Sequence, residues 1–190
     1  MWWFYTVILG MSFAQVLQEL ALAVRERSRD RTRNPYVPAM LWQVFLLALI
    51  VEVWLAATYY RDTVTQISIL ELLGFLLVPA GILVMSFLLP EAQHDGDRHG
   101  DPSEAFAQVR SLFFGVLIAI VAVNLLHGFL IGQQGWDVDL LFQCLIMAGA
   151  MAGLFLRGAV ADVVLAVVMI GIVAAYVGVG YSTVLVDGTG

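Results

Sequence analysis

The chain alternates between six long apolar stretches and shorter polar connections. The apolar stretches run roughly over 2–24, 37–60, 66–89, 106–132, 138–156 and 160–185. A helix that crosses the hydrocarbon core of a bilayer needs about 20 mostly apolar residues. Each stretch is long enough, so the pattern predicts an all-α bundle of six transmembrane helices that forms a single domain over residues 1–190.

Prolines and connection lengths refine this pattern. Pro38 suits the first turn of the helix over 37–60, and Pro90 suits the end of the helix over 66–89. The connection 61–65 is short, so these two helices are expected to be antiparallel neighbours. Two other connections are longer and polar, "RERSRDRTRNPYVP" and "PEAQHDGDRHGDPSE".

Composition supports a membrane protein rather than a soluble domain with one anchor. Hydrophobic residues make up 61% of the chain and charged residues only 13%, whereas soluble domains are about half apolar and a quarter charged. The lipid bilayer is therefore the expected surrounding of the protein. The formal net charge of −6 argues against nucleic-acid binding, which needs a basic surface.

The basic residues predict the orientation. All of them are Arg, and five lie in the first polar connection, at 25, 27, 29, 31 and 33. With six spans, Arg98, Arg110 and Arg157 fall on the same side, and only Arg61 falls on the other. Cytoplasmic connections carry the excess of Lys and Arg. Both termini are therefore predicted to be extracytoplasmic.

Three segments carry a family resemblance: "FYTVILGMSFAQVLQELALAVRER", "LWQVFLLALIVEVW" and "GFLLVPAGILVMSFLLPE". They resemble a group of small bacterial multi-pass inner-membrane proteins of unassigned function. This group shares a Tyr-Thr start, a Gln-Leu pair before a basic loop and a Trp-rich second helix. The resemblance covers roughly the first half of the chain and part of the fourth helix. It implies the bacterial cytoplasmic (inner) membrane as location and no activity.

Polar residues inside the apolar stretches need an explanation other than packing. A charged side chain near the bilayer centre costs about 2.5–3.5 kcal/mol on insertion scales. With the predicted orientation, Glu52, Glu71, His127 and Gln143 fall at similar depth in the outer half, with Asn124 one turn deeper. These five residues form a candidate polar layer on an ion pathway.

A second candidate layer lies toward the cytoplasmic side. Ser12, Gln15 and Glu19 share one face of the first helix, and Gln43 has comparable depth. Two polar layers around an apolar waist suit a gated ion or proton path. However, Gln43 and Glu52 are half a turn out of phase. The helix over 37–60 therefore contacts two compartments, or one of these residues makes only a structural hydrogen bond.

Structural alternatives remain open for several of these residues. Glu19 lies near the Arg-rich connection and can pair with it. Asp162 begins the last helix, where the helix dipole and nearby Arg157 stabilise a carboxylate. Single Gln residues in membrane helices, such as Gln15 and Gln143, are usually interhelical hydrogen-bond partners.

Small residues mark the last two helices. Gly149 and Gly153 form a GxxxG pattern, which lets helix backbones approach closely in lipid. The spacing recurs later, as Gly171/Ala175 and Ala174/Gly178. Two interpretations stay open. The faces pack within one bundle, or they form an interface with a second copy or another membrane protein.

The sequence contains few signs of a metal site, a cofactor site or an enzyme active site. His94, Asp97 and His99 offer metal-ligand types, but their spacing matches no specific motif. A zinc-protease, nucleophile-elbow or P-loop motif is absent, and the lack of Lys excludes a lysine Schiff base. Only His127 lies in a span, which excludes haem held by two intramembrane histidines. The chain is therefore expected to be neither an enzyme nor a cofactor protein.

The leading hypothesis is an ion- or proton-conducting channel or transporter, oligomeric in the membrane. Glu52 and Glu71 would form its titratable cation-attracting site, with His127 as their partner. The alternative is a non-conducting accessory or scaffold subunit of a larger membrane complex, in which the carboxylates tie helices together. A third class, an intramembrane enzyme acting on lipid, has no supporting motif.

Overall fold

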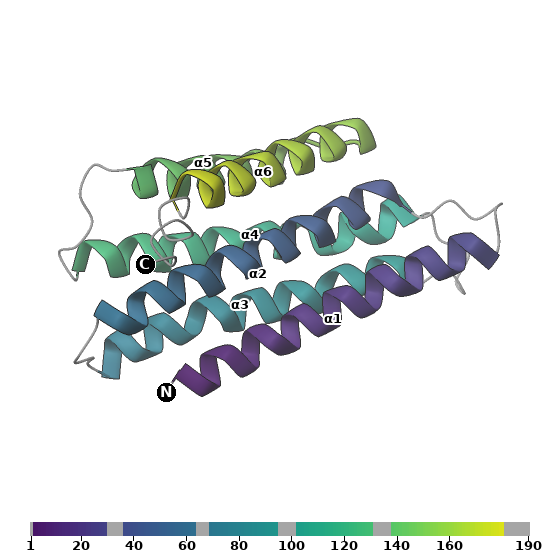
Figure 1. The fold of residues 1–190 in the computed structure, drawn as a ribbon. Helices are drawn as coiled ribbons and strands as arrows, with labels where there is room; N and C mark the ends of the chain where they lie inside the picture. The colour runs from purple at the N-terminus through teal and green to yellow at the C-terminus, as the bar shows by residue number, and fades with distance from the viewer. Residues whose placement is uncertain (1, 30–35, 64–68, 95–101, 131–137, 181–190) are drawn as a thin grey trace.

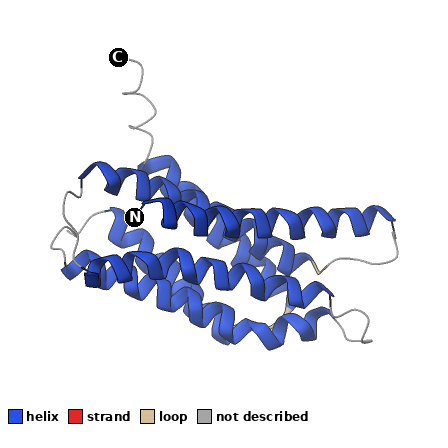
Figure 2. Cartoon of the chain, turned by 90° about the horizontal axis from the view of Figure 1, so that it is seen from below, coloured by secondary structure: helices blue, strands red, loops and turns tan. Residues whose placement is uncertain are grey.

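The protein is a bundle of six long helices. The computed structural model describes residues 2–29, 36–63, 69–94, 102–130 and 138–180. The helices are α1 (Trp2–Arg29), α2 (Val37–Thr63), α3 (Ile69–His94), α4 (Pro102–Leu130), α5 (Val138–Phe155) and α6 (Ala159–Gly180). Within these ranges there is no strand (Figure 2). Each helix contains a segment long and apolar enough to cross a membrane. The predicted fold is confirmed, and the chain is a multi-pass membrane protein.

The helices run alternately up and down the bundle in three layers (Figure 1). One outer layer holds α1 and α3, the middle layer α2 and α4, and the other outer layer α5 and α6. Helix α2 packs on α1, α3 and α6, and α4 packs on α3 and α5. The predicted contact between α2 and α3 is confirmed. Helices α1, α3 and α5 finish at the same end, which the Arg distribution predicts to be cytoplasmic.

Helix ends follow local chemistry, with one exception. The carbonyl of Tyr36 accepts the N–H of Ala39 at 3.0 Å, so α2 begins just after Tyr36 with Pro38 in its first turn, as expected. The reversal from α5 to α6 uses Gly158, whose φ of 122° strongly favours glycine. Helix α3, in contrast, continues past Pro90 to His94. The predicted end at Pro90 is wrong because a proline removes one backbone hydrogen bond without always stopping a helix.

An aromatic cluster fills the middle layer. Trp42, Phe45, Phe113 and Phe114 are fully buried. The Trp42 ring meets Phe113 and Phe114 edge to face, with centroids 5.6 and 5.0 Å apart. This geometry is the favoured one for aromatic pairs. The cluster fixes how α2 and α4 lie against each other, and this register positions the polar residues described below.

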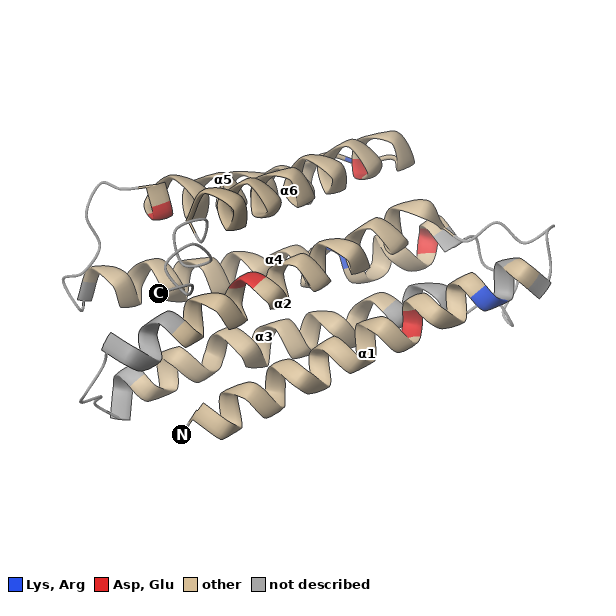
Figure 3. Cartoon of the chain, in the orientation of Figure 1, with Lys and Arg blue, Asp and Glu red and all other residues tan. Residues whose placement is uncertain are grey.

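The outward-facing surface is apolar along the helices. Trp3, Leu77, Phe129 and Val160 are among many large exposed apolar side chains, and few charged residues occur on the described helices (Figure 3). Without lipid, such a surface would be costly in water. The helices therefore contact the bilayer directly.

The GxxxG pair of α5 serves contacts within the bundle. A Cβ at Gly149 would lie 2.2 Å from the sulfur of Met169 on α6, and one at Gly153 would lie 2.4 Å from the ring of Phe114 on α4. Both glycines thus let neighbouring side chains approach the α5 backbone. Gly171 and Gly178 differ, because a Cβ at either position meets no atom within 4 Å. The small-residue face of α6 is therefore unoccupied in the chain described.

Candidate functional site

Glu52 lies level with Asn124 across the middle layer. Trp42 of α2 packs on Phe114 of α4, and the two helices run in the same direction (Figure 1). Glu52 follows Trp42 by ten residues, as Asn124 follows Phe114. Equal numbers of residues span equal lengths of helix, at about 1.5 Å per residue. The register therefore places Asn124 level with Glu52, whereas the sequence predicted Asn124 one turn deeper.

Gln143 of α5 belongs to the same level. Phe114 packs against Gly153, and α4 and α5 run in opposite directions (Figure 1). Gln143 precedes Gly153 by ten residues, as Asn124 follows Phe114 by ten. Side chains from α2, α4 and α5 thus reach one level, in the half of the bundle predicted to face outward.

Asp139, Gln143 and Tyr176 form a hydrogen-bonded group at this level. The Tyr176 hydroxyl donates to Asp139 Oδ1 at 2.5 Å, and Gln143 Nε2 donates to Asp139 Oδ2 at 2.8 Å. Gln143 reaches back one helical turn, while Tyr176 comes from α6. Asp139 lies in the first turn of α5, where the helix dipole stabilises negative charge. The Asp139 carboxylate is thus held in one orientation.

Glu52 completes what we call the outer cluster: Glu52, Asp139, Gln143 and Tyr176. Glu52 is half-buried, and the carboxylate of Asp139 repels it electrostatically. No hydrogen bond or ion pair to Glu52 occurs among the residues that the structure describes. An ionised carboxylate offers only acceptors. Two carboxylates from different helices thus repel each other, and Glu52 has no hydrogen-bond donor among the described residues.

The other predicted site residues lie elsewhere. Asn124 shares the level of the outer cluster but is exposed on α4. His127 packs toward α3, since its Cδ2 would lie 3.6 Å from a Cβ on Gly74. Helix α4 packs on both α3 and α5, so it separates His127 from the outer cluster. Glu71 belongs to α3, but its side chain lies outside the described residues.

The predicted metal ligands are His94, Asp97 and His99. Asp97, His99 and the side chain of His94 lie outside the described residues. Within the part of the chain that is described, no group of three or more His, Cys, Asp or Glu residues could hold a metal ion.

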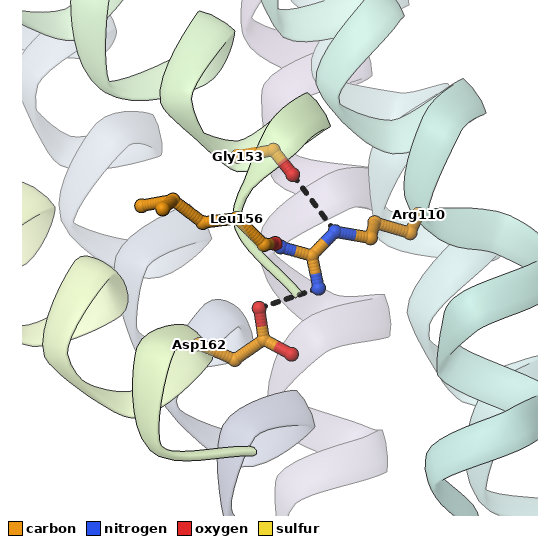
Figure 4. A network of polar contacts seen from close by, with 4 residues as sticks. All are labelled: Arg110, Gly153, Leu156 and Asp162. Carbon is orange, nitrogen blue, oxygen red and sulfur yellow. Dashed lines mark hydrogen bonds and ion pairs between the residues drawn. The ribbon is translucent and has the colours of Figure 1, made fainter. Parts of the chain in front are cut away.

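A second polar assembly lies at the opposite end of α5 (Figure 4). Arg110 Nε donates to the carbonyl of Gly153 at 2.8 Å, and its Nη2 donates to the carbonyl of Leu156. Arg110 Nη1 lies 2.6 Å from Asp162 Oδ1, and the two side chains are only 8% and 2% exposed. We call these four residues the Arg110 clamp.

The clamp supplies hydrogen-bond donors to backbone carbonyls at the C-terminal end of α5. The last carbonyls of a helix have no intrahelical donor, and the planar guanidinium presents several donors at once. The Tyr36 side chain also hydrogen-bonds to Asp162, and Arg110 lies 5.9 and 5.5 Å from the ring centroids of Phe106 and Phe114. The clamp therefore ties α4 to the α5–α6 turn and to the start of α2.

The sequence interpretation missed the clamp. Arg157, the expected partner of Asp162, is exposed, and Asp162 pairs with Arg110 instead. Arg110 was assigned to the cytoplasmic connections, yet it lies inside the membrane-crossing part of α4. Its position within the predicted helix over 106–132 was the available signal, because a charge there needs a partner. Asp139 and Tyr176 gave no comparable signal, since each lies near a helix end.

Comparison of the chain with models of protein families, with curated proteins and with solved structures finds no match.

Proposed function

We propose that the protein is an ion- or proton-conducting channel or transporter of the bacterial inner membrane, and that the outer cluster binds the cation. The observation that carries the proposal is Glu52, a half-buried carboxylate within a membrane helix that has no donor among the described residues and is repelled electrostatically by Asp139. Ionisable residues inside membrane helices commonly mark ion or proton pathways.

The arrangement around Asp139 distinguishes this cluster from a simple tie between helices. Tyr176 and Gln143 hold the Asp139 carboxylate, while Glu52 is left without a hydrogen bond in the described part of the bundle. A proton or a metal cation bound between the two carboxylates removes their repulsion. By contrast, the buried charges of the Arg110 clamp neutralise each other, as expected of a structural pair.

Gln43 and Glu52 lie half a turn apart on α2, and the opposite faces of this helix pack on different neighbours. Helix α2 packs on α1 and α3 and also on α6, and Glu52 interacts electrostatically with Asp139 of α5. The proposed path therefore follows the α2–α5–α6 side of the bundle in the outer half. His127, predicted as a partner of Glu52, belongs to the α3–α4 side and is left out of this path, whereas the side chain of Glu71 lies outside the described residues.

The proposal predicts that flux depends on both carboxylates. Wild-type protein in liposomes should carry H⁺ or a monovalent cation under a pH or voltage gradient. Glu52→Gln and Asp139→Asn should each reduce the flux to that of protein-free vesicles, because each removes one charge from the cation site. The measurement is vesicle flux, read with a pH-sensitive dye and with ion electrodes.

A matched control lies at the same level. Asn124→Ala changes a polar side chain that is level with Glu52 but exposed, so its flux should equal that of the wild type. If Glu52→Gln and the wild type carried equal flux, the outer cluster would not be the cation site.

One observation favours the alternative of a non-conducting accessory or scaffold subunit. The α6 face with Gly171 and Gly178 has open space above both glycines, and small residues are typical of helix contacts in membranes. A partner helix from another protein or a second copy can pack there. Absence of flux for every ion tested, with intact folded protein, would favour this alternative over conduction.

A further inference from the structure

An open groove lies beside the turn that joins α5 to α6. Its volume is about 690 Å³, which is within the range of small-molecule pockets. The side chains that line it include Leu156, Arg157, Val160, Val164, Leu165 and Val168. The groove therefore extends from the end of α5 along the first two and a half turns of α6, about 14 Å of helix.

Most of the groove surface is apolar. Val160, Val164 and Val168 recur every four residues, so they lie along one face of α6. Each is more than half exposed, and α5 and α6 form an outer layer of the bundle (Figure 1). The three valines belong to the membrane-spanning segment Ala159–Gly180. This stripe is therefore a surface for the acyl chains of lipids.

Arg157 gives one end of the groove a positive charge. It is exposed, and it is the one charged side chain among the described residues that line the groove. No ion pair or hydrogen bond to its side chain occurs in the described part of the chain. Asp162, its expected partner, is paired with Arg110 instead. The guanidinium of Arg157 is therefore available to an anion.

The backbone beside Arg157 is held in place by the Arg110 clamp. Arg110 donates to the carbonyl of Leu156, the residue before Arg157, and pairs with Asp162 of α6. The first backbone hydrogen bond of α6 runs from the N–H of Asp162 to the carbonyl of Gly158. The N–H groups of residues 159–161 precede that bond, and such groups favour a nearby anion. They add to the attraction that Arg157 exerts.

A phospholipid matches both parts of the groove. A head-group phosphate accepts charge-assisted hydrogen bonds from a guanidinium, and an acyl chain covers the valine stripe. Helix α5 ends on the side that the Arg distribution predicts to be cytoplasmic, where basic pockets between membrane helices bind anionic head groups. A helix from another protein would cover the valines, but it would pair with Arg157 only if it carried a carboxylate at that depth.

We propose that this groove binds one anionic phospholipid, with the phosphate at Arg157 and one acyl chain along Val160, Val164 and Val168. The groove lies at the opposite end of α5 from the outer cluster. The proposal therefore stands whether or not the protein conducts.

The proposal predicts selective retention of an anionic lipid. The purified protein is prepared in detergent micelles that contain phosphatidylglycerol or phosphatidylcholine with identical acyl chains, and native mass spectrometry counts the bound lipids. The wild type should retain one phosphatidylglycerol molecule and prefer it to phosphatidylcholine about fivefold, as expected from one basic residue near an anionic lipid. Arg157→Gln should remove this preference.

Two matched pairs of variants test the two parts of the site. Arg25→Gln removes another exposed Arg, on α1 at the same end of the bundle, and should keep the preference that Arg157→Gln removes. Val164→Trp should fill the groove and reduce the binding of phosphatidylglycerol. Val167→Trp changes an exposed valine of α6 that does not line the groove, so it should leave binding unchanged.

Three results would overturn the proposal. The first is equal retention of the two lipids by the wild type. The second is an equal effect within either pair of variants, because general surface charge or general surface shape would then explain the binding. The third is a dimer in the wild-type spectrum that Val164→Trp dissociates, because a second copy would then occupy the groove. Since the readout is bound lipid, none of these results bears on the flux proposal.

Discussion

Replacing Arg110 by methionine is expected to destabilise the protein by about 3–5 kcal/mol. The change leaves the Asp162 carboxylate buried without its cation and removes the donors to the carbonyls of Gly153 and Leu156. Methionine keeps much of the side-chain length, so the loss comes from charge and hydrogen bonds rather than from a large cavity. The measurement is equilibrium unfolding in mixed micelles with increasing denaturant.

Two further variants isolate the ion pair. Arg157→Met removes an exposed Arg in the neighbouring turn and should change stability by less than about 0.5 kcal/mol. The double variant Arg110→Met with Asp162→Leu should be more stable than Arg110→Met alone, because no buried charge is left unpaired. A cost for Arg110→Met as small as that for Arg157→Met would contradict the structural role of the clamp.

Gly153→Ala is expected to be the next most damaging change, by about 1–3 kcal/mol. The added Cβ would lie 2.4 Å from the ring of Phe114. That ring cannot move easily, since it packs on both Trp42 and Phe113 and lies beside Arg110. The clash should outweigh the better helix propensity of alanine, which is worth about 1 kcal/mol. Thermal and denaturant unfolding would measure the loss.

Gly171→Ala supplies the matched control, because a Cβ at this position meets nothing within 4 Å. It should be neutral or slightly stabilising. Gly149→Ala should fall between the two, since its closest contact is the flexible end of Met169. If Gly153→Ala were as harmless as Gly171→Ala, the close packing of α5 on α4 would be refuted.

Helix positions were predictable because they depend on local properties of the chain. Six apolar stretches of membrane-spanning length define six helices, and counting residues along them gives approximate depth. That count correctly placed Gln143 near the level of Glu52. The antiparallel contact of α2 with α3 followed from a short connection, which also depends on the sequence alone.

Rotation around each helix axis was not predictable in the same way. Asn124 and Glu52 are level, yet Asn124 is exposed while Glu52 interacts electrostatically with Asp139. Most of the membrane stretches are apolar on all sides, so hydrophobic periodicity does not reveal which face is inside. The pairing of Tyr176 with Asp139 and of Arg110 with Asp162 depends on three-dimensional contacts between distant segments.

The Arg110 clamp has a mechanical consequence for the opposite end of the α5–α6 hairpin. It fixes the turn of the hairpin through Gly153, Leu156 and Asp162, whereas Asp139 lies fourteen residues before Gly153 on α5. That distance is about 21 Å of helix, so Asp139 lies far from the end of the hairpin that the clamp holds. A tilt of about 5° around that end displaces Asp139 by roughly 2 Å relative to Glu52. A tilt of the hairpin about its fixed end would therefore change the spacing of the two carboxylates more than any contact near the clamp.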